Sequence, residues 1–235
     1  MVGGGAIFFL AQSFLMVLSE IAPGLWVFVA PGAQSNVFLL QGSSFLLVDS
    51  GTFAAGRALL QALQAEGIRQ RDIGLVLHSH GHADHFGASV FFPEAVLAMS
   101  KIDGARVNAR DDAFSLASAF GVERWPLLTR FLFDNETISF GGWELQVLAT
   151  PGHTSGSLCF LEKKRGWLFS GDTLFAGTCG RLDLVSGSAA EMKKSLLRIR
   201  SLDYSLLLPG HGPSVGRRLR SNVDAALAIV EEGAP

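Results

Sequence analysis

Apolar runs separated by turn residues dominate positions 25–49 of the chain. These runs contain leucine, β-branched and aromatic side chains, and they cover residues 25–30, 36–41 and 44–49. Runs of this length and composition predict antiparallel strands. The pattern becomes helical over 53–67, where Leu59 and Leu63 stand at helical spacing and Gly67 offers a favoured stop.

Strand-like and helix-like patterns alternate through the rest of the chain. A strand is predicted at 74–79 and a helix at 83–92, which Pro93 ends. Further strands are predicted at 143–150, 157–162, 166–171 and 205–210. A helix is predicted from Ser188, because Glu191 stands at capping-box spacing, and a last helix is predicted around residues 223–230.

This order of elements predicts an α/β fold in which two sheets pack together and helices lie outside them. Residues 101–135 are less regular, and we expect their apolar side chains to cover a core or to form a lid. No low-complexity linker divides the chain. We therefore expect a single domain at 19–235.

Residues 1–18 are predicted to be an apolar N-terminal extension, to which the sequence assigns no role. The run Ala6–Leu18 is apolar, but no Lys or Arg precedes it and two polar residues interrupt it. It is shorter than the roughly 20 apolar residues that a transmembrane helix needs, so we expect no stable membrane span. The sequence from Met16 onward reads as a natural beginning.

The overall composition excludes several classes of partner. The 235 residues are 49% hydrophobic, which predicts a substantial buried core. The 19 Lys and Arg nearly balance the 21 Asp and Glu, so we expect neither nucleic acid nor an anionic membrane surface as a partner. Two cysteines are too few for a disulfide scaffold and favour a cytoplasmic location. A small-molecule substrate is expected, and the sequence does not define the oligomeric state.

Polar residues with useful chemistry follow the ends of five predicted strands. They are Asp49, the set His80, His82, Asp84 and His85, and then His153, Asp172 and His211. A strand holds a side chain in place while the following loop leaves it accessible, so strand ends are where sites are built. We therefore expect these residues to share one site.

Imidazole nitrogen and carboxylate oxygen are the ligands that zinc takes in catalytic sites. His80 and His82 are two residues apart, so in an extended stretch they share a face and could bind one ion, with Gly81 permitting a tight bend. Asp84 and His85 would point to another side and could serve a second ion. The candidates are more numerous than one tetrahedral ion can use.

Three residues near these motifs have structural explanations. His78 lies within the predicted strand and is expected to touch no metal. Cys159 lies in an apolar strand and is expected in the core, while Cys179 lies near the predicted site and need not react.

The motifs resemble those of the metallo-β-lactamase superfamily. The set at 80–85 forms its H-x-H-x-D-H motif. The other motifs follow in order, with Asp49 in VDSG, His153 in PGHTSGS, Asp172 in SGDTLF and His211 in PGHGP. The resemblance covers residues 25 to 213 and implies a four-layer αββα sandwich, with two mixed β-sheets between outer helices.

Within the superfamily, SGDTLFAGTCGR at 170–181 looks most like the glyoxalase II group, the hydroxyacylglutathione hydrolases. This likeness implies two divalent metal ions, with zinc expected first and iron or manganese as alternatives. The implied ligands are His80, His82 and His153 for the first ion, Asp84, His85 and His211 for the second, and Asp172 as a bridge. Asp49 would orient a ligand by a hydrogen bond, and Arg181 would contact the substrate.

The implied reaction is hydrolysis of a thioester or related ester by a metal-bound hydroxide. Asp84 is the expected catalytic carboxylate, because it would steer the hydroxide or move its proton. One departure concerns glutathione, since full-length glyoxalase II enzymes carry a C-terminal helical extension and only residues 214–235 follow the last motif here. A true β-lactamase is disfavoured, because the common zinc enzymes have a cysteine ligand where Asp172 stands.

Three alternatives stay open at this point. A lactonase would open a cyclic ester at the same metal ions, and residues 101–135 could accommodate an acyl chain. A persulfide dioxygenase would use a single iron and oxygen. A non-catalytic metal-binding module would keep the ligands without the reaction, although structural zinc sites are usually closed by four ligands.

Overall fold

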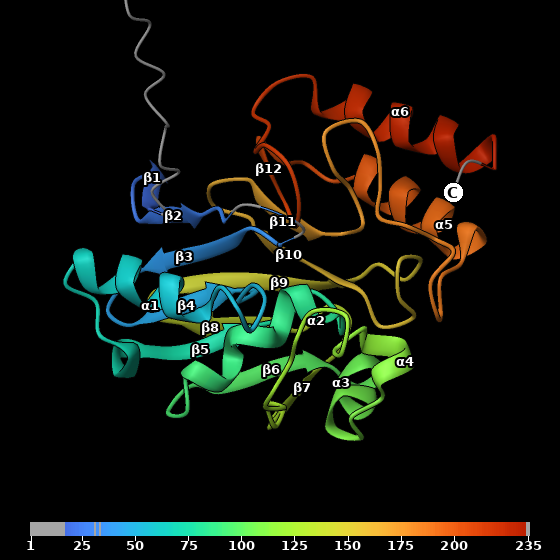
Figure 1. Cartoon of the computed structure of the whole chain (residues 1–235). Helices are drawn as coiled ribbons and strands as arrows, with labels where there is room; N and C mark the ends of the chain where they lie inside the picture. The colour runs from blue at the N-terminus through green and yellow to red at the C-terminus, as the bar shows by residue number, and fades with distance from the viewer. Residues whose placement is uncertain (1–16, 31, 33, 234–235) are drawn as a thin grey trace, which may run out of the picture.

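The computed structural model describes residues 17–30, 32 and 34–233, which form two β-sheets with helices outside them (Figure 1). The first sheet has seven strands in chain order: β1 (Leu18–Ala22), β2 (Leu25–Phe28), β3 (Val37–Gln41), β4 (Phe45–Val48), β5 (Ile73–Leu77), β6 (Val96–Ser100) and β7 (Arg130–Leu132). The second has five strands in the order β12-β11-β10-β9-β8: β8 (Thr137–Phe140), β9 (Trp143–Ala149), β10 (Leu158–Glu162), β11 (Trp167–Gly171) and β12 (Leu206–Pro209). Each half of the chain therefore supplies one sheet.

Both sheets are mixed. Strands β1 to β4 are antiparallel, whereas β4, β5, β6 and β7 are parallel. Strands β8 to β11 are antiparallel, and β11 and β12 are parallel. Parallel neighbours need crossover connections, and helices provide most of these. The helical elements are α1 (Gly56–Ala65), η1 (Gln70–Asp72), α2 (Ala83–Phe86), η2 (Gly87–Phe91), α3 (Lys101–Asn108), α4 (Asp112–Ser115), α5 (Ala189–Arg200) and α6 (Leu219–Glu231).

The core between the two sheets explains the unbroken apolar runs of the sequence. In β3, Phe38 and Leu40 face the second sheet, whereas Val37 and Leu39 belong to the cluster under the outer helices. The ring of Phe38 meets Phe169 of β11 edge-on, with 5.4 Å between the ring centroids. A strand that is buried on both faces has no polar side, so its sequence does not alternate.

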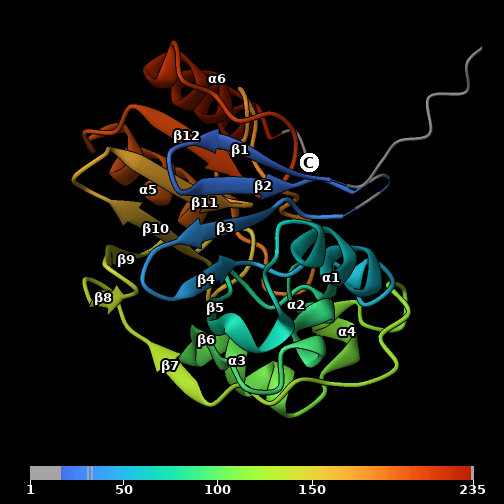
Figure 2. The ribbon, with the colours of Figure 1, turned by 90° about the vertical axis from the view of Figure 1, so that its left-hand side faces the viewer.

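Helices cover the outer face of each sheet. Figure 2 shows α1, α2 and α4 gathered beside the seven-stranded sheet. On the other side of the molecule, Met192 of α5 and Val223 of α6 join Leu168 and Leu207 of the five-stranded sheet in a buried cluster. The predicted arrangement of two mixed sheets between outer helices is confirmed.

Several boundaries differ from the predicted ones. The helix predicted at 83–92 is the short α2 followed by the 3-10 helix η2, since Gly87 disfavours a continuous α-helix and the Ser89 hydroxyl bonds to His78. The pattern also fails to predict β1, β6, β7, β8, η1, α3 and α4. Their apolar faces are short, and tertiary packing decides their conformation.

The predicted N-terminal extension falls largely on residues 1–16, which lie outside the described residues. Leu18 already pairs with Phe28, so the first strand begins one residue inside the expected extension. Within the described part of the chain, no helix is both long enough and apolar enough to cross a bilayer.

The start of α5 offers a test of the helix cap. Ser188 is the N-cap, and its Oγ accepts a hydrogen bond from the backbone N–H of Glu191 at 3.3 Å. Ser188→Ala should lower the free energy of unfolding by about 1 kcal/mol in urea denaturation, because one N–H of the first turn loses its acceptor. Ser188→Asp keeps an acceptor and should retain wild-type stability. Equal stability of the alanine variant and the wild type would contradict this role.

Candidate metal centre

Five strand ends converge where the two sheets meet, and they bring the predicted site residues together. These residues follow β4 (Asp49), β5 (His80 to His85), β9 (His153), β11 (Asp172) and β12 (His211). Backbone hydrogen bonds hold the strand ends close, since Leu158 N–H donates to Ser79 O at 2.7 Å and Gly210 N–H donates to Gly171 O at 2.8 Å. Six of the seven predicted ligands are buried, and the side chain of His211 is 30% exposed.

The first group of candidate ligands contains His80, His82 and His153. His80 Nε2 lies 3.1 Å from His82 Nδ1, which lies 2.8 Å from His153 Nε2. The imidazole planes of His82 and His153 are inclined to each other by 83°, so the two rings meet edge to face. Three ring nitrogens from two separate loops therefore face one small volume.

The second group contains Asp84, His85 and His211. His85 Nε2 lies 3.3 Å from His211 Nε2 and 3.7 Å from Asp84 Oδ2. The remaining pair, His211 Nε2 and Asp84 Oδ2, is separated by 3.1 Å. Two nitrogens and one carboxylate oxygen are therefore gathered beside the first group.

Asp172 lies between the two groups. Its Oδ1 is 3.3 Å from His85 Nε2, and its Oδ2 is 3.5 Å from His153 Nε2. Oδ2 is also 3.6 Å from His211 Nε2. One carboxylate thus faces ring nitrogens of both groups.

Neighbouring acceptors fix the proton on the outer nitrogen of two histidines. His153 Nδ1 lies 2.7 Å from the backbone oxygen of Arg181, and His85 Nδ1 lies 2.8 Å from Asp49 Oδ2. A carbonyl or carboxylate oxygen can only accept, so each Nδ1 carries the proton and donates it. In the neutral ring, Nε2 then presents its lone pair to the centre.

Ser79 orients His80 in the same way. The Ser79 hydroxyl donates to Asp49 Oδ2 at 2.9 Å, so it can accept from His80 Nδ1, which lies 3.0 Å away. Asp49 Oδ1 accepts the Ser79 backbone N–H at 2.8 Å. One buried carboxylate therefore controls the orientation of His80 and His85, one from each group.

Burial and charge set the protonation of the centre. Burial lowers the pKa of His80 and His82, with His82 reaching about 3, so both are neutral. Burial would raise the pKa of Asp172, but His85 and other nearby histidines outweigh it and hold the pKa below its usual value. Burial also opposes charge on His85, whereas the surrounding carboxylates of Asp172 and Asp49 raise its pKa.

The donor set fits divalent cations. Unprotonated nitrogens about 3 Å apart repel each other through their lone pairs unless a proton or a cation lies between them. The carboxylates of Asp84 and Asp172 add negative charge to the same buried volume. Imidazole and carboxylate together suit zinc, iron and manganese, so a positively charged metal ion would relieve this arrangement.

Two glycines make room for the centre. A Cβ at Gly81 would lie 2.6 Å from the Phe114 ring, so glycine is needed there for space, and its φ is not positive as a left-handed bend would require. A Cβ at Gly210 would lie 2.3 Å from Asp172 Oδ1. Close approach, rather than backbone conformation, explains both residues.

Asp103 is a buried residue of this region that the sequence does not reveal. Its Oδ2 accepts hydrogen bonds from Gly81 N–H at 3.0 Å and from the Thr154 hydroxyl at 2.6 Å. It therefore joins the two loops that carry the first group. Ser100 is the N-cap of α3 and accepts a hydrogen bond from the backbone N–H of Asp103; this spacing could have located the start of α3, but not the contact of Asp103 with the histidine loop.

The other residues that the sequence analysis names are not among the candidate ligands. His78 is buried, with Nδ1 3.0 Å from Ala98 O and Nε2 2.6 Å from Ser89 Oγ. The guanidinium of Arg181 is exposed and pairs with Asp183 at 2.6 Å, while its backbone oxygen serves the centre. Cys159 is buried in the core, and Cys179 is partly buried.

Comparison with known protein sequences identifies the family. The model described as the metallo-beta-lactamase superfamily matches residues 30–211. A probable metallo-hydrolase of Methanocaldococcus jannaschii is 30% identical over 197 residues, which cover 80% of this chain and 92% of that protein. A hydroxyacylglutathione hydrolase of Synechococcus sp. is 35% identical over 186 residues, covering 73% of this chain and 62% of that protein.

Comparison with solved structures gives the same fold. A metallo-beta-lactamase family protein from Thermus thermophilus has a TM-score of 0.78 and 26% identity, covering 91% of this chain and 81% of that chain. A protein solved in a di-iron-bound form has a TM-score of 0.68 and 29% identity, covering 80% of this chain and 93% of that chain. The chain belongs to the metallo-β-lactamase superfamily. It is a metallo-hydrolase of that superfamily, with His and Asp clusters able to hold metal ions.

Asp103 provides a test of how the first group is held. Asp103→Ala should lower the free energy of unfolding of the metal-free protein by about 1–3 kcal/mol for each buried donor, Gly81 N–H and Thr154 O–H, that loses its acceptor. Asp103→Asn keeps an acceptor oxygen and should lose less. Urea denaturation measures both, with Asp203→Ala at an exposed position as the control. Wild-type stability of Asp103→Ala would contradict the role of this carboxylate.

Proposed function

We propose that the chain hydrolyses thioesters or related esters with two divalent metal ions. The observation that carries this proposal is the position of Asp172, whose Oδ1 lies 3.3 Å from His85 Nε2 and whose Oδ2 lies 3.5 Å from His153 Nε2. A carboxylate between two ligand groups can be shared by two cations. Two donor atoms that bind the same tetrahedral ion at about 2.0–2.2 Å lie about 3.3–3.6 Å apart, which is the scale of these separations.

Each ligand group would hold one ion. The first ion would take His80, His82 and His153, the second would take Asp84, His85 and His211, and Asp172 would serve both. Three protein ligands and the shared carboxylate give each ion four protein ligands, so water or substrate would enter as a fifth ligand, a coordination number that catalytic zinc sites can reach. When bound, such ions lower the pKa of water and polarise the carbonyl under attack.

Asp84 is the carboxylate that we assign to proton transfer. Burial would raise its pKa, but His85 and His211 outweigh this effect and lower the pKa below its usual value. Asp84 is therefore ionised, and while Oδ2 would bind the ion, the other carboxylate oxygen, Oδ1, can accept a proton from a water molecule that attacks the substrate. Asp49 supports the reaction indirectly, because its bond to His85 Nδ1 keeps His85 Nε2 directed at the centre.

The names of several relatives support a thioester as the substrate. Several relatives named hydroxyacylglutathione hydrolase are 28–36% identical to this chain. The chain spans 62% or less of the length of each of these four relatives, so glutathione recognition does not follow from the match. Arg181 would bind a carboxylate of the substrate in place of its present partner, Asp183. Breaking the Arg181–Asp183 ion pair costs little free energy, because exposed ion pairs are weak.

Removal of the metal ions tests the proposal. Protein purified without added chelator should contain close to two equivalents of zinc, iron or manganese and should cleave an S-acylglutathione faster than a lactone. EDTA should abolish this activity, and readdition of the metal should restore it. Activity that persists after complete metal removal would refute the proposal. Faster lactone cleavage would favour a lactonase, and oxygen uptake with glutathione persulfide would favour a dioxygenase.

Substitution of the shared carboxylate tests the two-ion site. Asp172→Asn should lower both metal content and thioesterase activity, the latter by about 100-fold or more, because changes merely next to a metal ligand already cost about 10–100-fold. Asp203→Asn is the matched control, because this carboxylate is exposed. Metal content is measured by elemental analysis and activity by thiol release. An Asp172→Asn variant with two equivalents of metal and full activity would exclude the shared role.

A further inference from the structure

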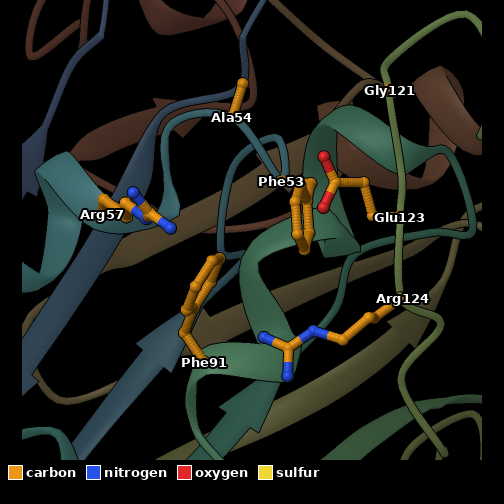
Figure 3. A pocket seen from close by; sticks show the side chains of 7 residues that line it. All are labelled: Phe53, Ala54, Arg57, Phe91, Gly121, Glu123 and Arg124. Carbon is orange, nitrogen blue, oxygen red and sulfur yellow. The ribbon is translucent and has the colours of Figure 1, made fainter.

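A groove separate from the metal centre lies on the helical side of the seven-stranded sheet (Figure 3). It has a volume of about 500 Å³, which is within the range of small-molecule sites. Its walls come from the segment before α1, from α1 itself, from η2 and from the connection between α4 and β7. None of the residues that line it is one of the seven candidate ligands.

Two aromatic rings form one side of the groove. Phe53 and Phe91 lie with 5.4 Å between their ring centroids and an angle of 33° between their planes. Gly56 permits this arrangement, because a Cβ there would lie 2.2 Å from the Phe91 ring. The groove therefore offers two apolar ring faces, inclined to each other, of the kind on which another aromatic ring stacks.

Two guanidinium groups flank the rings. Figure 3 shows Arg57 and Arg124 extending toward the phenylalanine pair from opposite sides, and Arg124 lies 5.6 Å from the centroid of Phe91. Within the described residues, neither guanidinium has an ion pair or a side-chain hydrogen bond. Guanidinium groups pair with carboxylates through two parallel hydrogen bonds, so both groups have unused capacity for an anion.

Glu123 limits the charge of the ligand. Its carboxylate also lines the groove, beside Phe53, so the lining has two positive charges and one negative charge. A ligand with a single negative charge balances this lining, whereas a dianion would meet repulsion from Glu123. The carboxylate can also accept a hydrogen bond from a hydroxyl or amino group of the ligand.

From these features we infer that the groove binds a small aromatic monocarboxylate. Its ring stacks on Phe53 and Phe91, its carboxylate binds Arg57 and Arg124, and a polar ring substituent donates to Glu123. This site does not depend on the reaction proposed for the metal centre, because the two share no lining residue or ligand.

Calorimetric titration of the metal-loaded protein with 4-hydroxybenzoate tests the inference. The benzoate should bind more tightly than 4-hydroxybenzyl alcohol, which lacks the charge, and than acetate, which lacks the ring. Arg57→Gln and Arg124→Gln should each weaken binding by about tenfold, the effect of losing one charged hydrogen-bonding partner. Phe91→Leu should weaken it by several-fold without abolishing it.

The controls separate this site from other modes of binding. Arg71→Gln changes an exposed arginine of η1 outside the groove and should leave the affinity unchanged. Arg57 and Arg124 are exposed, so their variants should keep the wild-type melting temperature. Binding that is insensitive to both arginine variants would place the benzoate elsewhere, including at the metal ions, and would overturn the inference. Equal binding of the alcohol, tighter binding of inorganic phosphate, or no binding of the benzoate would also overturn it.

Discussion

The hydrogen bonds of the Asp49 carboxylate determine the arrangement of the metal centre. Asp49 follows β4 with a φ of 59°, a left-handed conformation that few residues other than glycine adopt. In this position it accepts the backbone N–H and hydroxyl of Ser79 and faces Nδ1 of His85. A buried carboxylate needs such partners because water cannot solvate it. One side chain therefore holds the ends of β4 and β5 and the helix α2.

The two sheets bring the other half of the centre to this network. Ser79 O accepts the backbone N–H of Leu158, so the strand end that carries His80 is bonded to the sheet that positions His153 and Asp172. The core between the sheets fixes the distance, and the ligand atoms within each cluster lie within 4.8 Å of one another. Such preorganisation has an electrostatic cost, because lone pairs and carboxylates are concentrated without cations. Metal binding would offset this cost, so it would stabilise the fold and the site together.

The sequence predicts the elements that have strong local signals. Continuous apolar runs predict the central strands, and polar residues after these runs predict all seven candidate ligands. It does not predict β7 or β8, which are short edge strands whose conformation depends on their neighbours. It also cannot show that Asp103 reaches Gly81, because that contact depends on how α3 packs against the histidine loop. For Arg181, local sequence cannot decide whether the side chain or the backbone oxygen faces the centre.

Residues 49–53 connect the metal centre with the groove. Ser50 bonds to the backbone oxygen of His85 through both its N–H, at 2.7 Å, and its hydroxyl, at 3.0 Å. Gly51 O then accepts the N–H of Ala88 at 3.1 Å, two residues before Phe53 reaches the groove. The contacts that hold His85 thus also fix the backbone that presents Phe53. The same bonds that order the metal ligands therefore hold one wall of the groove in a fixed shape. Because this wall is already ordered, binding of a ligand would cost the protein little conformational entropy there.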